Sequence, residues 1–313
     1  TPVAFLARGR FWVNNHAHVV TGTAESDTRF LSHLLSITDL SGYLTGSTQP
    51  KLSRRALDSI QLVIPPVDTQ RAIAEVLGAL DDKIAANELL AQRADELASA
   101  LFADDVRGAT LSGKTFDDVA SVRGGGTPSS KVPEYWGGEI AWATPTDVTA
   151  LQGPYLFDTA RKITATGLAN CASDLHPAGS ILMTSRATIG AFAIAGRPTA
   201  VNQGFIVVFP DRDTPGMWLF HEMRSRITEF TSMANGATFL ELSRGNFKRF
   251  RVRLAEQSAM RDFDERARAL HRRAASALHE NLALAATRDA LLPGLMSGAL
   301  RVKDAERVAE WMR

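Results

Sequence analysis

The sequence predicts an α+β protein in which two copies of a mixed α/β module are joined by two long helices packed antiparallel as a coiled coil. Three observations support this fold class: an internal repeat, a heptad pattern after each copy, and short strand-like runs inside the copies. The boundaries that we expect are 1–65 for the C-terminal part of the first module, 66–105 for the first helix, 106–254 for the second module, 255–297 for the second helix and 298–313 for a C-terminal tail.

The internal repeat consists of two matching stretches. Residues 13–20 (VNNHAHVV) match residues 201–208 (VNQGFIVV) at an offset of 188, and Leu52-Ser53-Arg54 matches Leu242-Ser243-Arg244 at an offset of 190. A module that occurs twice presents two similar surfaces to its ligand. The second match lies about 90 residues into its module and the first lies at the start of the chain, so we expect roughly 75 to 80 residues of the first module to be absent here.

The two helices are predicted from apolar residues spaced alternately by four and three. The first begins after Pro65-Pro66, with Asp68 or Thr69 as its cap, and the second is expected to end at Pro293-Gly294. Each seam is rich in alanine and carries one asparagine, Asn87 or Asn281, a polar residue that is expected to fix the register of the two helices. A helix of about 35 to 40 residues is about 50 to 60 Å long, so the pair is expected to act as a spacer. The seam positions are Ile73, Leu77, Leu80, Ile84, Asn87, Ala91, Ala94, Ala98 and Leu101, and Met260, Phe263, Ala267, Leu270, Ala274, Ala277, Asn281, Leu284, Arg288 and Leu291.

Within the modules, the pattern predicts strands over 140–143, 180–184 and 205–209, a helix over 216–234 and a turn at 124–128. His16 and His18 are expected on one face of a further strand. These two histidines lack a third ligand, and Cys171 alone can form neither an intrachain disulfide nor a zinc site, so no metal is expected. No run of about 18 apolar residues and no basic-then-apolar leader occurs, which favours a cytoplasmic protein that does not enter the membrane.

The near-zero net charge hides a regional split. Residues 106–253 hold 16 Lys and Arg against 12 Asp and Glu, and residues 1–66 hold 6 against 4. Residues 67–105 hold 3 against 9 and are acidic. The basic modules suit a polyanion partner, although an ordinary solvated surface has the same excess.

The chain resembles the specificity subunit of type I restriction-modification enzymes. The resemblance implies two target-recognition domains that alternate with two conserved helices, and the absent opening of the first domain is a departure from this pattern. It rests on motifs that follow the family's order over nearly the whole chain: residues 12–18 (WVNNHAH), 64–66 (IPP) with Gln70, 124–128 (GGGTP) with Tyr135-Trp136, 181–186 (ILMTSR) with Gly190, 200–203 (AVNQ) and 288–298 (RDALLPGLMSG).

The resemblance implies a DNA-recognition subunit that reads a bipartite, asymmetric target in double-stranded DNA. It also implies partners: two methyltransferase subunits docked on the helices to methylate adenine, and restriction/translocase subunits for cleavage. S-adenosylmethionine, Mg²⁺ and ATP would belong to those partners. The residues agree with a non-catalytic role, because Ile64-Pro65-Pro66-Val67 lacks the polar and aromatic residues of a methyltransferase motif and residues 124–131 lack the Gly-Lys-Thr ending of a phosphate loop.

Polar and basic loop residues are the candidate DNA contacts. Arginine and lysine bind phosphates or guanine, and amides read adenine, whereas the alternative for each residue is an ordinary surface loop or a turn-stabilising amide. The basic run from Arg244 to Arg253 is expected to contact phosphates, or to alternate within a strand with half of it against the acidic first helix. The candidates are Asn14, Asn15, Lys51, Arg54, Ser129, Ser130, Lys131, Thr144, Thr146, Ser185, Arg186, Asn202, Gln203, Arg244 and Lys248.

The alternative class is a protein that does not bind nucleic acid, either a coiled-coil adaptor or a carbohydrate-binding module. Five tryptophans could form a sugar platform, but they are scattered, and most fit apolar faces of the core. They are Trp12, Trp136, Trp142, Trp218 and Trp311.

Overall fold

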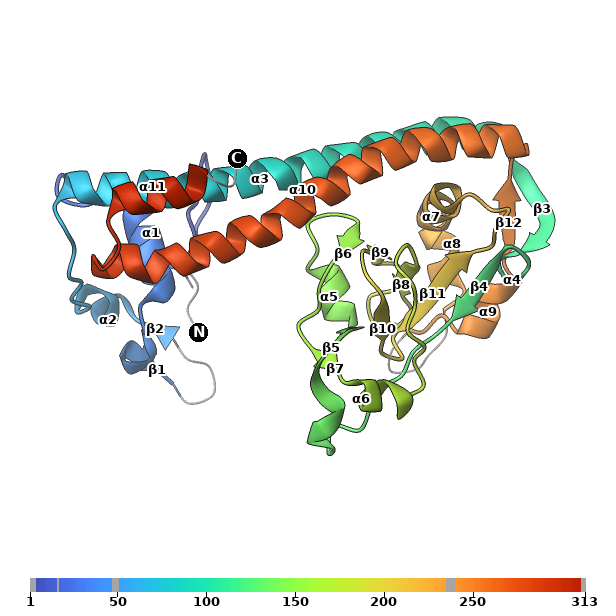
Figure 1. Cartoon of the computed structure of the whole chain (residues 1–313), viewed down its shortest axis with the longest axis horizontal. Coiled ribbons are helices and arrows are strands. Elements are labelled where there is room, and N and C mark those ends of the chain that lie inside the picture. Colours follow the sequence, from blue (N-terminus) through green and yellow to red (C-terminus); the bar gives the residue numbers. More distant parts are fainter. Residues whose placement is uncertain (1–3, 16, 47–50, 235–239, 311–313) are drawn as a thin grey trace. The chain divides into compact units, whose positions relative to one another are not determined.

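A computed structural model of the chain describes residues 4–15, 17–46, 51–234 and 240–310. The chain divides into two compact units, one from residues 1–86 and 281–313 (unit 1) and one from residues 87–280 (unit 2). Both long helices, α3 (Val67–Asp105) and α10 (Gln257–Ser297), contribute a part to each unit. The mixture of sheets and long helices in Figure 1 confirms the α+β class.

Unit 1 is mainly helical. Its helix α1 (Thr28–Ile37) is capped by Asp27, whose side chain accepts a hydrogen bond from the Phe30 amide. The fully buried Gln70 of α3 accepts from the Asp27 amide and donates to two backbone carbonyls, which fixes the entry into both helices. Besides its parts of α3 and α10, the described part of unit 1 contains α1 (Thr28–Ile37), a 3₁₀ turn (Ser41–Tyr43), β1 (Leu44–Thr45), β2 (Lys51–Leu52), α2 (Arg54–Asp58) and α11 (Val302–Glu310).

Within unit 1, α3 and α10 pack antiparallel along their predicted seams. Leu77 and Leu80 are buried in the same cluster as Leu284 and Leu291. Arg288 donates to Asp81 at 2.9 Å, and the side-chain amide of Asn281 donates to the Ile84 carbonyl at 3.2 Å. The contact residue on α3 therefore moves from 81 to 84 as that on α10 moves back from 288 to 281, which is the antiparallel direction. Helix α10 continues through Pro293 to Ser297, beyond the last seam position and up to the expected boundary at residue 297.

Unit 2 carries the larger sheet structure. Its strands are β3 (Thr110–Thr115), β4 (Ala120–Arg123), β5 (Trp136–Ala143), β6 (Tyr155–Leu156), β7 (Lys162–Ile163), β8 (Ile181–Thr184), β9 (Phe192–Ala195), β10 (Thr199–Val201), β11 (Phe205–Pro210) and β12 (Arg251–Leu254). Its shorter helices are α4 (Phe116–Val119), α5 (Pro145–Thr149), α6 (Ala165–Ala169), α7 (Gly216–Ser225), α8 (Ile227–Ser232) and α9 (Arg244–Arg249), with 3₁₀ turns at Val106–Gly108 and Pro133–Tyr135.

A five-stranded sheet of order β4-β11-β8-β9-β6 forms the centre of unit 2, next to a three-stranded sheet β10-β5-β7 and a pair β12-β3. Both faces of the central sheet are covered. Ile181 and Met183 of β8 pack with helices α4, α7, α8 and α9, whereas Leu182 packs with residues of β5, α5 and β10. This two-sided burial explains why β8 and β11 are apolar runs without alternation.

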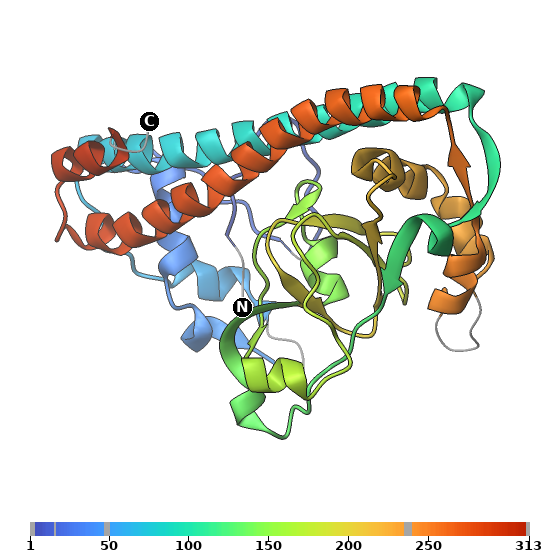
Figure 2. The ribbon, with the colours of Figure 1, turned by 45° about the vertical axis from the view of Figure 1, so that its right-hand side comes forward.

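Helix α7 packs between the central sheet and the long helices of unit 2, as both views show (Figures 1 and 2). Trp218 of α7 is fully buried against Phe102 of α3 and Phe263 of α10, with ring centroids 5.0 and 5.8 Å away. The long helices are antiparallel here too, because Arg266 pairs with Asp105 at 2.7 Å and Asn87 donates to Glu280 at 2.8 Å.

The two matching stretches differ in how far the structure repeats them. Ser53 and Ser243 cap α2 and α9 in the same way, each accepting a hydrogen bond from the amide three residues later. Residues 201–208, however, include the end of β10 and the start of β11, whereas the described residues of 13–20 form no strand. The strand expected at His18 is therefore wrong, and His16 lies outside the described residues. Strand β11 has β4 and β8 as neighbours, while the strands described in unit 1 are β1 and β2.

Two further expectations are corrected. The helix expected over 216–234 breaks at Arg226 into α7 and α8, because Arg226 turns into a buried ion network with Glu222 and Glu229. The basic run from Arg244 to Arg253 is not one strand but α9 followed by β12, and Arg253 pairs with Glu222 rather than with the acidic first helix. In the described part of the chain, no helix is long and apolar enough to cross a membrane.

Candidate nucleic-acid interface

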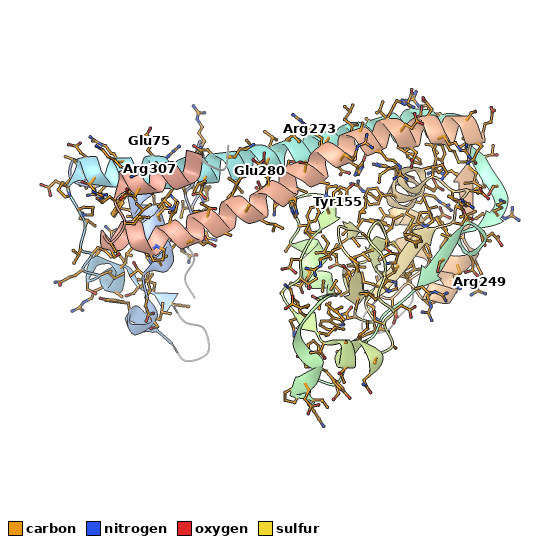
Figure 3. All side chains as sticks on the ribbon, viewed as in Figure 1. Glu75, Tyr155, Arg249, Arg273, Glu280 and Arg307 are labelled. Atoms are coloured by element: carbon orange, nitrogen blue, oxygen red, sulfur yellow. The ribbon has the colours of Figure 1, made fainter. Side chains whose placement is uncertain are left out.

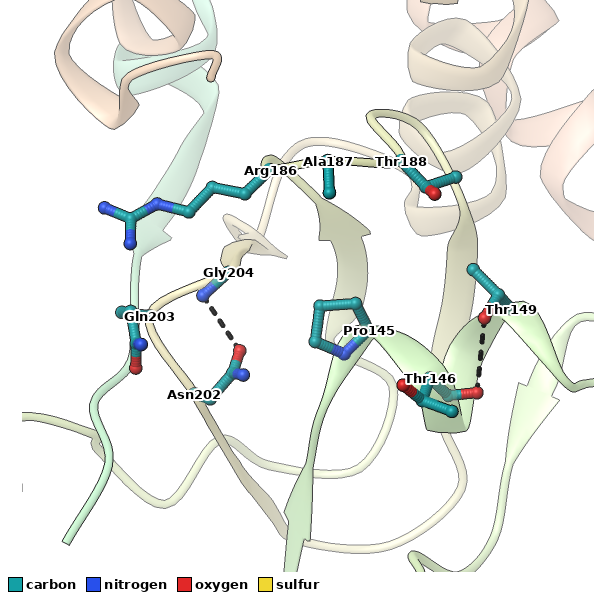
Figure 4. A pocket seen from close by; sticks show the side chains of 9 residues that line it. All are labelled: Pro145, Thr146, Thr149, Arg186, Ala187, Thr188, Asn202, Gln203 and Gly204. Carbon is teal, nitrogen blue, oxygen red and sulfur yellow. Dashed lines mark hydrogen bonds between the residues drawn. The ribbon is translucent and has the colours of Figure 1, made fainter. Parts of the chain in front are cut away.

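A pocket of about 320 Å³ lies in unit 2 where three short segments meet. The first is Thr144 with helix α5 after strand β5, the second is 186–188 shortly after β8, and the third is 202–204 after β10; we call them the first, second and third loop. Four sequence candidates, Thr146, Arg186, Asn202 and Gln203, line this pocket together (Figure 4). The other lining residues are Pro145, Thr149, Ala187, Thr188 and Gly204.

The first loop is fixed by a helix cap. Thr144 precedes α5, and both its amide and its hydroxyl donate to a carboxylate oxygen of Asp147, at 2.8 and 2.5 Å. Pro145 at the first helical position favours the same turn. The Thr144 hydroxyl therefore holds the cap, and the exposed side chains of Thr146 and Thr149 face the pocket.

The third loop is held by the side-chain amides of Asn202 and Gln203. The Asn202 side chain accepts from the Gly204 amide at 2.8 Å, and the Gln203 side-chain oxygen accepts from the Thr127 hydroxyl at 2.7 Å. Asn202 thus stabilises a turn, while the exposed Gln203 joins this loop to residues 124–128. Those residues lie close to the sheet, since a Cβ atom at Gly125 would lie 2.0 Å from the Val201 carbonyl oxygen.

The second loop carries the basic group of the pocket. Ala187 has φ of +58°, a left-handed conformation that is uncommon for a residue with a Cβ atom. Arg186 pairs with Glu241 through Nε, 2.7 Å from Oε1, and the two residues also form a backbone bridge. In Figure 4 the Arg186 side chain extends on the same side of the pocket as Gln203.

The remaining candidates of unit 2 lie outside the pocket lining. Ser129, Ser130 and Lys131 form an exposed loop, and Arg244 places Nη1 within 2.9 Å of where a Cβ atom of Gly124 would be. Ser185 is 3% exposed and serves through its backbone, accepting from the Leu242 amide. Lys248 pairs with Asp117 at 2.7 Å.

The candidates of unit 1 are exposed. Asn14 and Asn15 lie in a turn closed by the Ala17 amide, and Lys51 lies in β2. Arg54 begins α2 and lies 3.8 Å from Asp58. His18 contacts the Leu52 carbonyl through Nε2 at 2.8 Å, which gives it a structural partner.

Sequence reasoning missed part of the site. Thr149, Ala187, Thr188 and Glu241 were not among the candidates, although Glu241 directly precedes the repeated stretch Leu242-Ser243-Arg244. The tryptophans of the alternative class mostly serve packing: Trp142 and Trp218 are buried, and Trp136 lies under the Arg161 guanidinium at 3.5 Å. Trp12 is exposed, and Trp311 lies outside the described residues.

Comparison with protein families decides the assignment. The family described as "Type I restriction modification DNA specificity domain" matches residues 3–97 and 113–259. The chain belongs to this family. The match to two separate stretches agrees with the internal repeat.

Similar proteins carry names of the same kind. The chain is 36% identical over 141 residues to the type I restriction enzyme MjaIX specificity subunit of Methanocaldococcus jannaschii, a match that covers 44% of this chain and 33% of that protein. It is 21% identical over 331 residues to the HindI specificity subunit of Haemophilus influenzae, covering 81% of this chain and 72% of that protein. The type I restriction-modification S subunit of M. genitalium has a similar fold, with a TM-score of 0.54 at 17% identity, covering 87% of this chain and 73% of that structure.

Proposed function

We propose that this family member recognises a specific sequence in double-stranded DNA as the specificity subunit of a type I restriction-modification complex. The pocket formed by Thr146, Arg186 and Gln203 is the observation that carries the proposal. It gathers a guanidinium, hydroxyls and an amide from three loops, and these are the groups that read base edges in the major groove. The family match favours this function over a coiled-coil adaptor or a carbohydrate-binding module.

Arg186 is the residue best suited to read a base. Its Nε pairs with Glu241, and no described residue accepts a hydrogen bond from its terminal nitrogens. Those two nitrogens form the fork that binds O6 and N7 of guanine. Gln203 has its oxygen bonded to Thr127 and keeps its amide nitrogen for an acceptor on a base or phosphate.

A bipartite, asymmetric target follows from two modules that are similar but not identical. Asn14-Asn15 of the first module corresponds to Asn202-Gln203 of the second, so equivalent positions present different side chains. In the first module, Asn14, Asn15, Lys51 and Arg54 are the residues that we assign to the other half of the target. The two long helices would set the spacing between the half-sites.

The chemistry is assigned to partner subunits. Two methyltransferase subunits would dock on the long helices and methylate adenine, and restriction/translocase subunits would join them. S-adenosylmethionine, Mg²⁺ and ATP would be bound by those partners, because the sequence lacks a methyltransferase motif and a phosphate loop. A subunit that acts with them on cellular DNA would be cytoplasmic.

The test is to produce the chain with and without a cognate methyltransferase subunit. The pair is expected to methylate adenine at one bipartite sequence, mapped by single-molecule sequencing, and the chain alone is expected to methylate nothing. Binding of the pair to its target duplex should weaken steeply between low and moderate salt. Methylation by the purified chain alone, or salt-independent binding to a glycan array without DNA binding, would refute the proposal.

A further inference from the structure

Two buried histidines face each other inside unit 2. His221 of α7 and His271 of α10 are 2% and 1% exposed, and their Nε2 atoms are 3.1 Å apart. Asp95 of α3 lies beside them, with Oδ1 3.9 Å from Nε2 of His271. The ligand atoms of all three residues lie within 4.8 Å of one another.

The histidines do not satisfy each other fully. Of two facing neutral imidazoles, only one can donate a hydrogen bond to the other, because they share a single proton. Nδ1 of His221 has Ser99 Oγ at 3.4 Å, whereas Nδ1 of His271 has no hydrogen-bond partner within the described residues. The pair is also enclosed by aromatic rings, with Phe102, Phe220 and Phe263 within 5.9 Å of His221 between ring centroids.

We propose that Asp95, His221 and His271 form a zinc site that joins α3, α7 and α10 within unit 2. Zinc binds histidine nitrogens at about 2.0 to 2.1 Å, and two such ligands of a tetrahedral ion lie about 3.3 Å apart. The observed 3.1 Å between the Nε2 atoms is close to that spacing. Asp95 Oδ1 lies 3.9 Å from the His271 nitrogen, and its side chain would move closer to complete a third ligand.

The surroundings support this ligand set. Both rings are buried, at 2% and 1% exposed, and burial disfavours the charged imidazolium, which leaves the neutral ring that binds a metal. Asp95 is 16% exposed, so solvent reaches one side and can supply a water as fourth ligand. Tyr155, labelled in Figure 3, lies against His271 with ring centroids 5.9 Å apart.

Arg224 opposes the ion by charge but orients its carboxylate ligand. Its guanidinium donates to both oxygens of Asp95, at 2.6 and 2.9 Å, and its side chain is 31% exposed. Carboxylate oxygens have further lone pairs, and donors behind a ligating carboxylate are common in metal sites. Replacing Arg224 by glutamine should keep one hydrogen bond and remove the repulsion, and so tighten zinc binding by roughly two- to fivefold.

The experiment is a zinc titration of the chelator-stripped full chain, followed by calorimetry and thermal unfolding. We expect one zinc per chain and a rise in melting temperature that chelator reverses. His221→Gln and His271→Gln should lose stoichiometric binding. His279→Gln, an exposed histidine on the same helix as His271, should keep it. Equal zinc uptake by the native chain and both buried-site variants, or no stoichiometric uptake by the native chain, would overturn the proposal.

Cobalt provides a test that does not depend on the variants folding. Co²⁺ bound to the native chain in a tetrahedral site with nitrogen and oxygen ligands gives visible absorption bands, which zinc should displace. Weak absorption typical of hydrated Co²⁺ would overturn the site. Tighter binding by Arg224→Gln would confirm that this guanidinium repels the ion. Asp95→Asn should bind Co²⁺ more weakly than the native chain if Asp95 is a ligand, and unchanged binding by Asp95→Asn would exclude the arrangement proposed here.

Discussion

Arg186 and Glu241 are joined twice, by an ion pair of 2.7 Å between Nε and Oε1 and by a backbone bridge. The carboxylate therefore holds the guanidinium by the nitrogen nearest the side-chain stem. The terminal nitrogens have no acceptor among the described residues, so their fork stays available for a ligand. We expect Arg186 to contact the base and Glu241 to orient Arg186.

Arg186→Ala is expected to weaken binding of the assembled complex to its target by about 1 to 3 kcal/mol, because a bidentate guanine contact is lost. It should also relax the choice at one base pair of the half-site read by unit 2. Fluorescence anisotropy with the target and its single-base variants measures both effects. Arg212→Ala, at an exposed arginine outside the pocket lining, is the matched control. Equal weakening on every sequence would identify a phosphate contact instead.

Glu241→Gln is expected to reduce discrimination at the same base pair while it leaves binding to random DNA unchanged or slightly stronger. Glutamine removes the charge that fixes Nε, so the guanidinium samples more orientations, and one negative charge near DNA is also lost. Arg186→Ala combined with Glu241→Gln should discriminate no worse than Arg186→Ala alone. Additive losses in the double variant would show that Glu241 acts independently of Arg186.

Glu222→Ala is expected to destabilise unit 2 by about 3 to 5 kcal/mol, because it leaves two arginines partly unpaired. Glu222 is fully buried and binds both Arg226 and Arg253. Glu229→Ala is the control: Glu229 pairs with the same Arg226, but its side chain is 47% exposed, so the loss should be far smaller. Urea unfolding of the native chain and the two variants measures the difference in the free energy of unfolding. Similar losses in both variants would contradict a specific role for the buried carboxylate.

His176 is expected to make stability fall in mild acid. Burial is the main cause that lowers its pKa below 6.5, against the opposing effects of Asp174 and a hydrogen bond to the Gly124 backbone. Above pH 6.5 the ring is neutral in both states, but below it the unfolded chain binds a proton that the folded chain resists. The free energy of unfolding should therefore fall as the pH falls below 6.5, by at most about 1.4 kcal/mol per pH unit for this group.

The comparison for His176 is His176→Gln, measured by urea unfolding between pH 5 and 8. The variant should show a shallower decline than the native chain, because the other histidines are the same in both proteins. Parallel curves below pH 6.5 would exclude His176 as the cause.

Local and periodic features could be predicted from the sequence. The heptad spacing of Leu77, Leu80 and Leu284 gave the helix faces that meet, and the repeated serines at 53 and 243 proved to be matching helix caps. Each of these depends on residues close together in the chain or on a fixed period. The strand over 181–184 was likewise visible as a short apolar run.

Features that depend on distant partners could not be predicted. The break at Arg226 results from its burial with Glu222, and nothing in the local sequence distinguishes it from a continuing helix. Residues 13–20 resemble their strand-forming counterpart in sequence but lack its described neighbours. The pocket and the cluster of Asp95, His221 and His271 each combine residues from three segments, so neither could be predicted from spacing in the sequence.

The close approach of Gly125 to the sheet limits how this module can acquire a new target. Any side chain at position 125 would collide with the Val201 carbonyl. The loop beside Gln203 therefore cannot be varied at this position to fit a different base. A laboratory library built to change the recognised bases should therefore keep the glycine and randomise 146, 186 and 203 together. Libraries that also vary position 125 would consist mainly of chains with a distorted module, whatever bases their other residues could read.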